Sequence, residues 1–171
     1  MYKIGEYVMK ANTGVCKVDE IVTRRLAEGM EEKEYYVLIP VDDPRAKVFV
    51  PVASEKSNMR RAMGEQEAKD FIDSIPVIDV KWIENDKSRE QEYKNAMRSN
   101  DPVHLVGIIK NLYLRNIERE NQGKKVTAVD DRYFKMAENA LNSELAHALG
   151  IKKDDIRELI AESIEMKAAT G

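Results

Sequence analysis

The sequence predicts an α+β protein with two domains, a small antiparallel β-barrel followed by an all-α bundle of about five helices. Two observations lead to this prediction. Short β-branched and aromatic runs, separated by turn residues, occupy the chain up to Pro51. Beyond them, apolar residues recur with helical spacing. We therefore expect the barrel at residues 1–55, a linker at 56–64 and the helical domain at 65–171.

The N-terminal part contains strand-like segments at residues 7–9, 15–18, 21–22, 35–39 and 48–50. Turn-forming sequences separate them at residues 12–14, 28–29 and 42–44, where Gly and Asn allow positive φ and Pro presets the turn. Strands this short close most easily into a barrel, because closure removes the unpaired edges. Cys16, the only cysteine, lies in one of these strands, so we expect a buried hydrophobic residue rather than a reactive thiol.

The C-terminal part begins after a polar stretch without periodicity at residues 53–58. The pattern predicts a first helix over 65–74, which must end before Pro76. Residues 77–82 alternate between apolar and polar, which predicts an extended segment lying along an apolar surface. Asn85 or Asp86 can then cap a second helix that continues through Ser99.

Three more helices follow from cap signals. Asp101-Pro102 starts one that ends near Gly123, Thr127 caps a longer one that ends at Gly150, and Asp154 caps the last. Each carries an apolar stripe that we expect to be buried. The stripes are Leu105, Ile108, Ile109, Leu112 and Tyr113; Phe134, Ala137, Leu141, Leu145 and Ala148; and Ile156, Leu159, Ile160 and Ile164.

Composition limits the possible functions. Hydrophobic residues make up 43% of the 171 residues and charged residues 35%, which is typical of a soluble globular protein. The N-terminus has no signal-like pattern, and no apolar stretch approaches the about 20 residues of a membrane span, so we expect a cytoplasmic protein without a membrane partner. The formal net charge of −3 argues against holding nucleic acid by bulk electrostatics. Any DNA contact must be local or assisted.

Motifs of catalytic or metal chemistry are not evident. His104 and His147 stand apart from cysteines and from each other, and the sequence has neither a phosphate-binding Gly-rich loop nor a Gly-x-Ser-x-Gly elbow. The acidic pairs lie at turns or helix starts, where capping explains them. We therefore expect no enzymatic activity, no metal, no cofactor and no small-molecule ligand.

Basic residues nevertheless concentrate locally. Residues 110–135 carry an excess of three positive charges, including Lys124, Lys125 and Arg132, and a second group contains Lys87, Arg89, Lys94 and Arg98 among acidic neighbours. Either group could contact a phosphate backbone, although charged runs are more often solvated faces. Trp82, the sole tryptophan, could stack on bases, but its alternation with Ile78 and Val80 favours packing.

Several segments in order resemble the CarD family of bacterial transcription regulators. The N-terminal matches are residues 4–8, 14–21, 35–38 and 48–51, and the C-terminal ones are 93–94, 112–115, 118–119, 132–135 and 143–146. The transcription-repair coupling factor shares the N-terminal domain but also carries motor domains. The similarity covers nearly the whole chain, so the sequence is identified as a member of the CarD family.

This resemblance implies an SH3/Tudor-like barrel that binds the RNA polymerase β subunit, with Arg24, Leu26 and Phe49 at the contact. It also implies a helical domain that touches promoter DNA at the upstream edge of the bubble, in the minor groove, and stabilises the open complex. Tethering to polymerase raises the effective concentration of that domain near DNA, which makes an acidic DNA-binding protein reasonable. We expect a monomer when the protein is free. The alternative is a polymerase-bound adaptor without direct DNA contact.

Two positions depart from the family pattern. Phe49 stands where a second polymerase-contacting arginine is usual, and Arg89 stands where the family has a tryptophan that wedges into DNA. Trp82 lies seven residues before that place. Three interpretations stay open: Trp82 reaches DNA from another position, Arg89 inserts into a narrow minor groove, or the wedge is missing.

Overall fold

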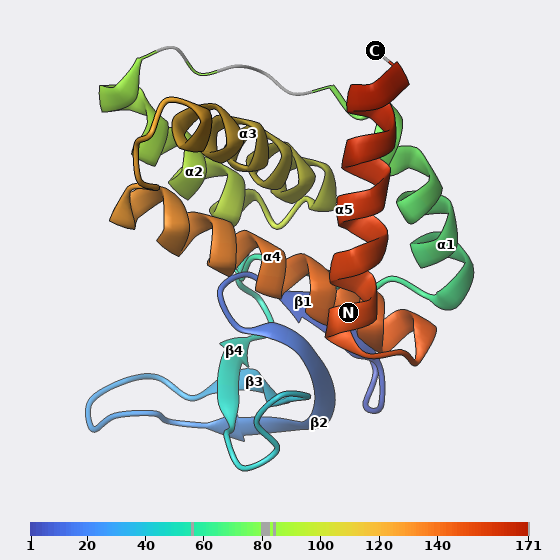
Figure 1. Cartoon of the computed structure of the whole chain (residues 1–171). Helices are drawn as coiled ribbons and strands as arrows, with labels where there is room; N and C mark the ends of the chain where they lie inside the picture. The colour runs from blue at the N-terminus through green and yellow to red at the C-terminus, as the bar shows by residue number, and fades with distance from the viewer. Residues whose placement is uncertain (56, 80–82, 84, 171) are drawn as a thin grey trace. The chain divides into compact units, whose positions relative to one another are not determined.

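The computed structural model describes residues 1–55, 57–79, 83 and 85–170, without the side chains of 166–170 (Figure 1). The chain divides into two compact units, Met1–Ala62 and Met63–Gly171. The first contains the strands and the second the helices, so the predicted α+β layout of two domains is confirmed.

The N-terminal unit is built on a five-stranded antiparallel sheet, counted over the described residues, with the order β4-β3-β2-β1-β5. The strands are β1 (Tyr7–Lys10), β2 (Gly14–Arg24), β3 (Lys33–Pro40), β4 (Val48–Pro51) and β5 (Met59–Arg61). The two segments predicted at 15–18 and 21–22 are one long strand. A register shift between Val18 and Glu20 interrupts the β2–β3 ladder, and such a bulge bends a strand without ending it.

The turn between β1 and β2 depends on its glycine. Gly14 has a φ of +100°, which a side chain would strain, and it pairs with Lys10 at the end of the ladder. Beyond this turn, Cys16 is fully buried as predicted and packs with Val8, Leu38 and other strand residues in the core of this unit. Side chains alternate between the two faces of each strand, so the side chains of one face form the core of this unit.

Strand β5 lies in the segment predicted to be a linker, residues 56–64. Met59, Arg60 and Arg61 pair with β1. The sequence did not indicate this strand, because three residues are too few to show an alternation and their pairing partner lies about 50 positions earlier. The linker prediction is therefore wrong for this stretch, which belongs to the N-terminal unit.

The helical unit contains α1 (Glu65–Ser74), the short 3₁₀ helix η1 (Ile75–Val77), α2 (Asp86–Ser99), α3 (Pro102–Asn121), α4 (Ala128–Leu149) and α5 (Lys153–Thr170). The predicted start signals act as expected, since the side chains of Asn85, Asp101 and Thr127 accept backbone N–H groups at the starts of α2, α3 and α4. Gly150 ends α4 in the left-handed conformation.

Two details differ from the sequence pattern. Helix α5 begins at Lys153, so Asp154 lies in its first turn, and the Lys152 carbonyl accepts the N–H groups of Asp155 and Ile156. Leu159 is 38% exposed, whereas Ile156, Ile160 and Ile164 are buried. The buried face follows a strict four-residue spacing, which leaves Leu159 at its border. The core otherwise follows the predicted stripes of α3 and α4.

Candidate functional site

On the outer face of the N-terminal sheet, the Arg24 side chain lies over the Phe49 ring. The Arg24 guanidinium lies 4.8 Å from the centre of the Phe49 ring, a cation–π arrangement. Phe49 pairs with Val37, and Val37 pairs with Glu20, which shares a face of β2 with Arg24 four residues further on. Two of the residues that the sequence associated with polymerase binding are thus brought together.

A hollow of about 340 Å³ adjoins this pair. Val22 and Val37 line it together with Arg24 and Phe49, and Glu20 and Lys47 form an ion pair of 3.9 Å across its lining. Sequence analysis did not single out Val22 or Val37, since apolar strand residues normally read as core. The surface therefore combines an apolar floor with one exposed guanidinium.

Leu26 lies beyond the end of β2, in the connection to β3. It is 48% exposed, and Met30 of the same connection is 57% exposed. Figure 1 shows this connection as a long hairpin that projects from the sheet. Met30 lies on the same connection as Leu26 and is also exposed, so it joins Leu26 as a candidate contact residue.

Five of the predicted DNA-binding residues are exposed: Lys87, Lys94, Lys124, Lys125 and Arg132. Elements far apart in the sequence bring them to one end of the helical unit. The start of α4 meets α2 where Glu90 accepts Arg132 at 3.1 Å and Lys94 at 3.7 Å. We call this region, with the α3–α4 connection, the basic end (Figure 1, left).

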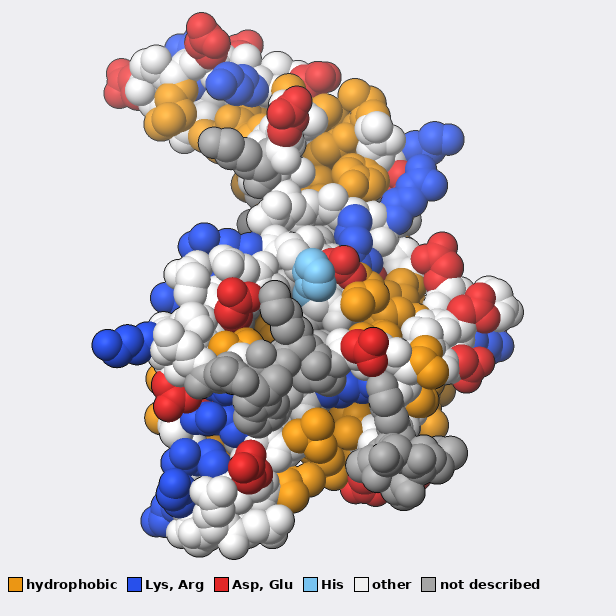
Figure 2. All heavy atoms as spheres, turned by 90° about the horizontal axis from the view of Figure 1, so that it is seen from above, with side chains coloured by type: hydrophobic (Ala, Val, Ile, Leu, Met, Phe, Trp, Pro, Cys, Tyr) orange, Lys and Arg blue, Asp and Glu red, His pale blue; other side chains and the backbone are white. Residues whose placement is uncertain are grey.

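The α3–α4 connection carries Lys124 and Lys125 in a fixed backbone. Arg119 donates from Nε to the Lys125 carbonyl at 3.0 Å, and the Lys124 N–H donates to the Arg119 carbonyl at 2.8 Å. Figure 2 shows Lys and Arg side chains interspersed with Asp and Glu on the visible face rather than in one continuous patch. The electrostatic field of these cations is therefore local, which agrees with the negative net charge of the chain.

Arg89 occupies a different kind of position. It is 3% exposed and donates to the Ile83 carbonyl at 2.8 Å, to Tyr93 Oη at 2.5 Å and to Asn111 Oδ1 at 3.0 Å. An arginine held by internal acceptors cannot insert into a groove without breaking them. In this structure Arg89 joins α2 to α3, and its interpretation as a DNA wedge stays a prediction.

The network around Arg89 continues to α4. Tyr93 Oη donates to Asp130 at 3.1 Å, and Asp130 accepts Arg115 Nε at 2.9 Å. Burial, followed by the nearby Asp130 carboxylate, raises the pKa of Tyr93 to about 12, so its hydroxyl stays neutral. Asp130 thus serves twice, since its carboxylate joins the network while its N–H donates to Thr127 Oγ1 at 3.1 Å.

Lys110 is a second buried cation that the sequence placed among surface charges. It is 3% exposed, and its ammonium group donates to the carbonyls of Ile75 and Ile78. Ile75 is the first residue of η1 and Ile78 follows its last, before the segment that carries Trp82. Trp82 itself lies outside the described residues, so both of its interpretations stay predictions.

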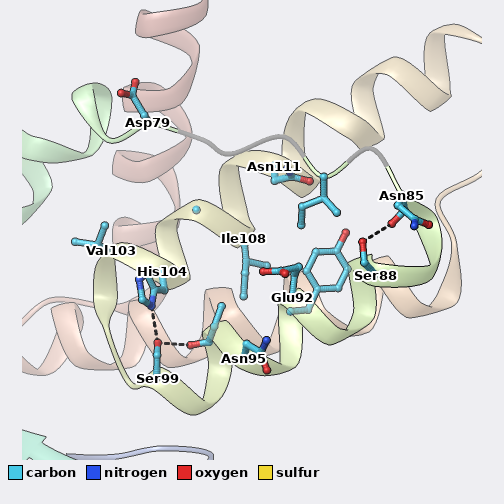
Figure 3. Close-up of a pocket in the computed structure, with 14 residues that line it drawn as sticks. Asp79, Asn85, Ser88, Glu92, Asn95, Ser99, Val103, His104, Ile108 and Asn111 are labelled. Carbon is cyan, nitrogen blue, oxygen red and sulfur yellow. Dashed lines mark hydrogen bonds between the residues drawn. The ribbon is translucent and has the colours of Figure 1, made fainter.

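A groove of about 710 Å³ runs between α2 and α3. Figure 3 places its titratable residues Asp79, Glu92 and His104 in separate parts of the lining, and His104 Nδ1 is 2.9 Å from Ser99 Oγ. These side chains do not converge on one point, as an acid–base pair would.

The described residues contain no cluster of His, Cys, Asp and Glu that could hold a metal ion. None of the described helices is long and apolar enough to span a bilayer.

Comparison with known proteins assigns both units. The family model of the CarD-like/TRCF RID domain matches residues 2–63, and that of the CarD C-terminal domain matches residues 79–161. A search of curated proteins finds no match. The first range includes the Arg24–Phe49 surface and β5, and the second contains the basic end. With both domain models matched in order, the chain belongs to the CarD family of non-catalytic transcription factors and is a transcription-related protein that interacts with RNA polymerase.

Proposed function

We propose that this protein binds the β subunit of RNA polymerase through the Arg24–Phe49 surface and contacts promoter DNA through its basic end, stabilising the open complex. The observation that carries the proposal is that each matched domain presents one candidate surface. The first offers an exposed guanidinium on an aromatic ring. The second offers five exposed cations from three parts of the chain.

The polymerase surface suits a partner with both apolar and acidic groups. Phe49 supplies an aromatic ring where a second arginine would add a positive charge, and it also orients the Arg24 guanidinium. Leu26, at 48% exposure, can add an apolar anchor from the β2–β3 connection. Aromatic and arginine anchors dominate the energetics of protein interfaces, so these residues should matter more than surrounding lysines.

Binding of the full-length chain to purified β subunit tests this half. Arg24→Glu should weaken binding at least about tenfold, because it replaces a cationic anchor with a repelled charge. Lys3→Glu is the matched control, since it reverses an exposed charge elsewhere on the N-terminal unit. Equal affinities of the two variants would rule out the Arg24–Phe49 surface as the contact.

The DNA half requires little intrinsic affinity, because the polymerase tether supplies a high effective concentration. Lys124 and Lys125 are the most direct candidates, since they are exposed on a connection whose backbone is held by Arg119. Glu90 partly neutralises Arg132 and Lys94 and should reduce their contribution. Contacts of this kind position a protein on the phosphate backbone without reading sequence.

The double variant Lys124→Glu with Lys125→Glu tests DNA contact in a polymerase–promoter complex. It should accelerate collapse of the open complex and lower the salt dependence of its stability by a slope of about two, one for each lost phosphate contact. The control is the double variant Lys152→Glu with Lys153→Glu, an adjacent pair beyond the C-terminal end of α4, where the α4–α5 connection leads into α5. Unchanged open-complex lifetime in the first variant, with polymerase binding intact, would favour the adaptor without DNA contact.

A further inference from the structure

The last turn of α3 is tied to the α3–α4 connection at both ends of one residue, Arg119. Its carbonyl accepts the Lys124 N–H at 2.8 Å, and its Nε donates to the Lys125 carbonyl at 3.0 Å. Gly123 makes this return of the chain possible, because its φ of +72° is a left-handed conformation that ends a helix. The main chain of Arg119 thus holds one lysine of the connection, and its side chain holds the next.

Ion pairing separates these three cations from others of the basic end. Arg132 pairs with Glu90 at 3.1 Å, so part of its charge is compensated within the protein. Arg119, Lys124 and Lys125 form no ion pair with any carboxylate of the part of the chain that the structure describes. Their charges are therefore available to a partner.

The carboxylates next to Arg119 in the sequence do not change this. Glu118 and Glu120 flank it, but side chains one position apart on a helix do not face each other. Among the described residues, the guanidinium makes one hydrogen bond, from Nε to the Lys125 carbonyl. The other N–H groups of an arginine lie on its two Nη atoms, in one plane with Nε. The bond at Nε therefore orients this plane, and the Nη donors are left for an external acceptor.

A phosphate group matches such a pair of donors, because two parallel N–H groups can bind two of its oxygens. We propose that Arg119 binds a phosphate of promoter DNA through its Nη groups while its Nε holds Lys125 beside the same backbone. This inference rests on the proposed function and adds a direct contact to it. Arg119 both touches DNA and positions the lysine, so the phosphate contact is formed before DNA arrives, which lowers the cost of binding.

Replacing Arg119 with lysine separates geometry from charge, since lysine keeps the charge and loses both the Nε donor and the planar pair of donors. Arg119→Lys should shorten the lifetime of the open complex about tenfold, the effect of one lost charge-assisted hydrogen bond. The salt dependence should stay unchanged, because the number of cations is the same. Arg119→Gln should shorten the lifetime and also lower the salt slope by about one.

Arg157→Lys is the matched control for these variants. Arg157 of α5 also donates from Nε, to Glu138 at 2.8 Å, so the same exchange is made at an arginine outside the basic end. Its open-complex lifetime should equal that of the unmodified protein. Melting temperatures of all variants show whether each one folds.

Neutral methylphosphonate linkages, placed one at a time along the upstream edge of the bubble, locate the phosphate without relying on a folded variant. At one position the linkage should shorten the lifetime with the unmodified protein but not with Arg119→Gln, in which the contact is already missing. The proposal is overturned if no position behaves in this way, as expected for an arginine that binds a carboxylate of polymerase instead. It is equally overturned if Arg119→Lys has the lifetime of the unmodified protein.

The double variant Lys124→Glu with Lys125→Glu shows which conclusion such a failure reaches. If this variant still shortens the lifetime, DNA contact by the basic end stands and only the Arg119 contact is withdrawn. If it has no effect either, both the Arg119 contact and the DNA half of the proposed function are overturned.

Discussion

Replacing Arg89 with alanine tests the difference between a residue that touches DNA and one that holds the helical unit together. The substitution removes donors from the Ile83 carbonyl, Tyr93 Oη and Asn111 Oδ1, all near a side chain that is 3% exposed. Each buried acceptor left without a donor costs about 1–3 kcal/mol, so the loss of all three donors should cost at least about 3 kcal/mol. For a unit of this size, that loss corresponds to a drop in Tm of more than about 10 °C.

Thermal and urea unfolding of the full chain, followed by circular dichroism, measure this loss. Lys87→Ala is the control, because it removes an exposed cation from the same helix and should change stability by no more than about 0.5 kcal/mol. An Arg89→Ala protein with unchanged Tm but faster collapse of the open complex would refute the structural role. It would restore the interpretation of Arg89 as the wedge.

Three further predictions concern stability and reactivity. Thr127→Ala should destabilise the protein by about 1 kcal/mol in urea unfolding, because Oγ1 caps the Asp130 N–H at 3.1 Å, whereas Thr127→Ser should cost little. Glu144→Leu should cost about 1–3 kcal/mol, since the fully buried carboxylate accepts the Met63 N–H at 3.0 Å; a loss no larger than that of Glu144→Gln would contradict this. Burial raises the pKa of Cys16 from 9.0 to about 11, so alkylation at pH 8 should be about 100-fold slower than in urea. Because the folded pKa is the higher one, this contribution to stability is complete below pH 9.0 and is lost as the pH rises through about 11.

Local signals predicted most helix boundaries in this protein. Asn85, Asp101 and Thr127 cap the helices they were expected to cap, and Gly150 ends α4. These interactions join residues a few positions apart, so their partners can be read directly from the sequence. Strand β5 was missed because its pairing partner is β1, at the other end of the unit.

For the candidate surfaces, too, the sequence indicated individual residues, and the fold showed which of them lie together. Sequence resemblance pointed to Arg24, Leu26 and Phe49 one at a time, whereas the stacking of Arg24 on Phe49 depends on β2, β3 and β4 lying in register. Lys124 and Lys125 could be recognised from local charge. Their association with cations of α2 required the packing of α4 against α2.

The sequence by itself determined the two-domain layout, the helix caps and the family, because periodicity, turn chemistry and ordered motifs are local or additive along the chain. Only the tertiary structure showed that Arg89 is buried. Its acceptors come from residues 83, 93 and 111, and no local pattern distinguishes a buried arginine from an exposed one. Burial depends on how the whole helical unit packs, so the sequence could not show that Arg89 lies inside it.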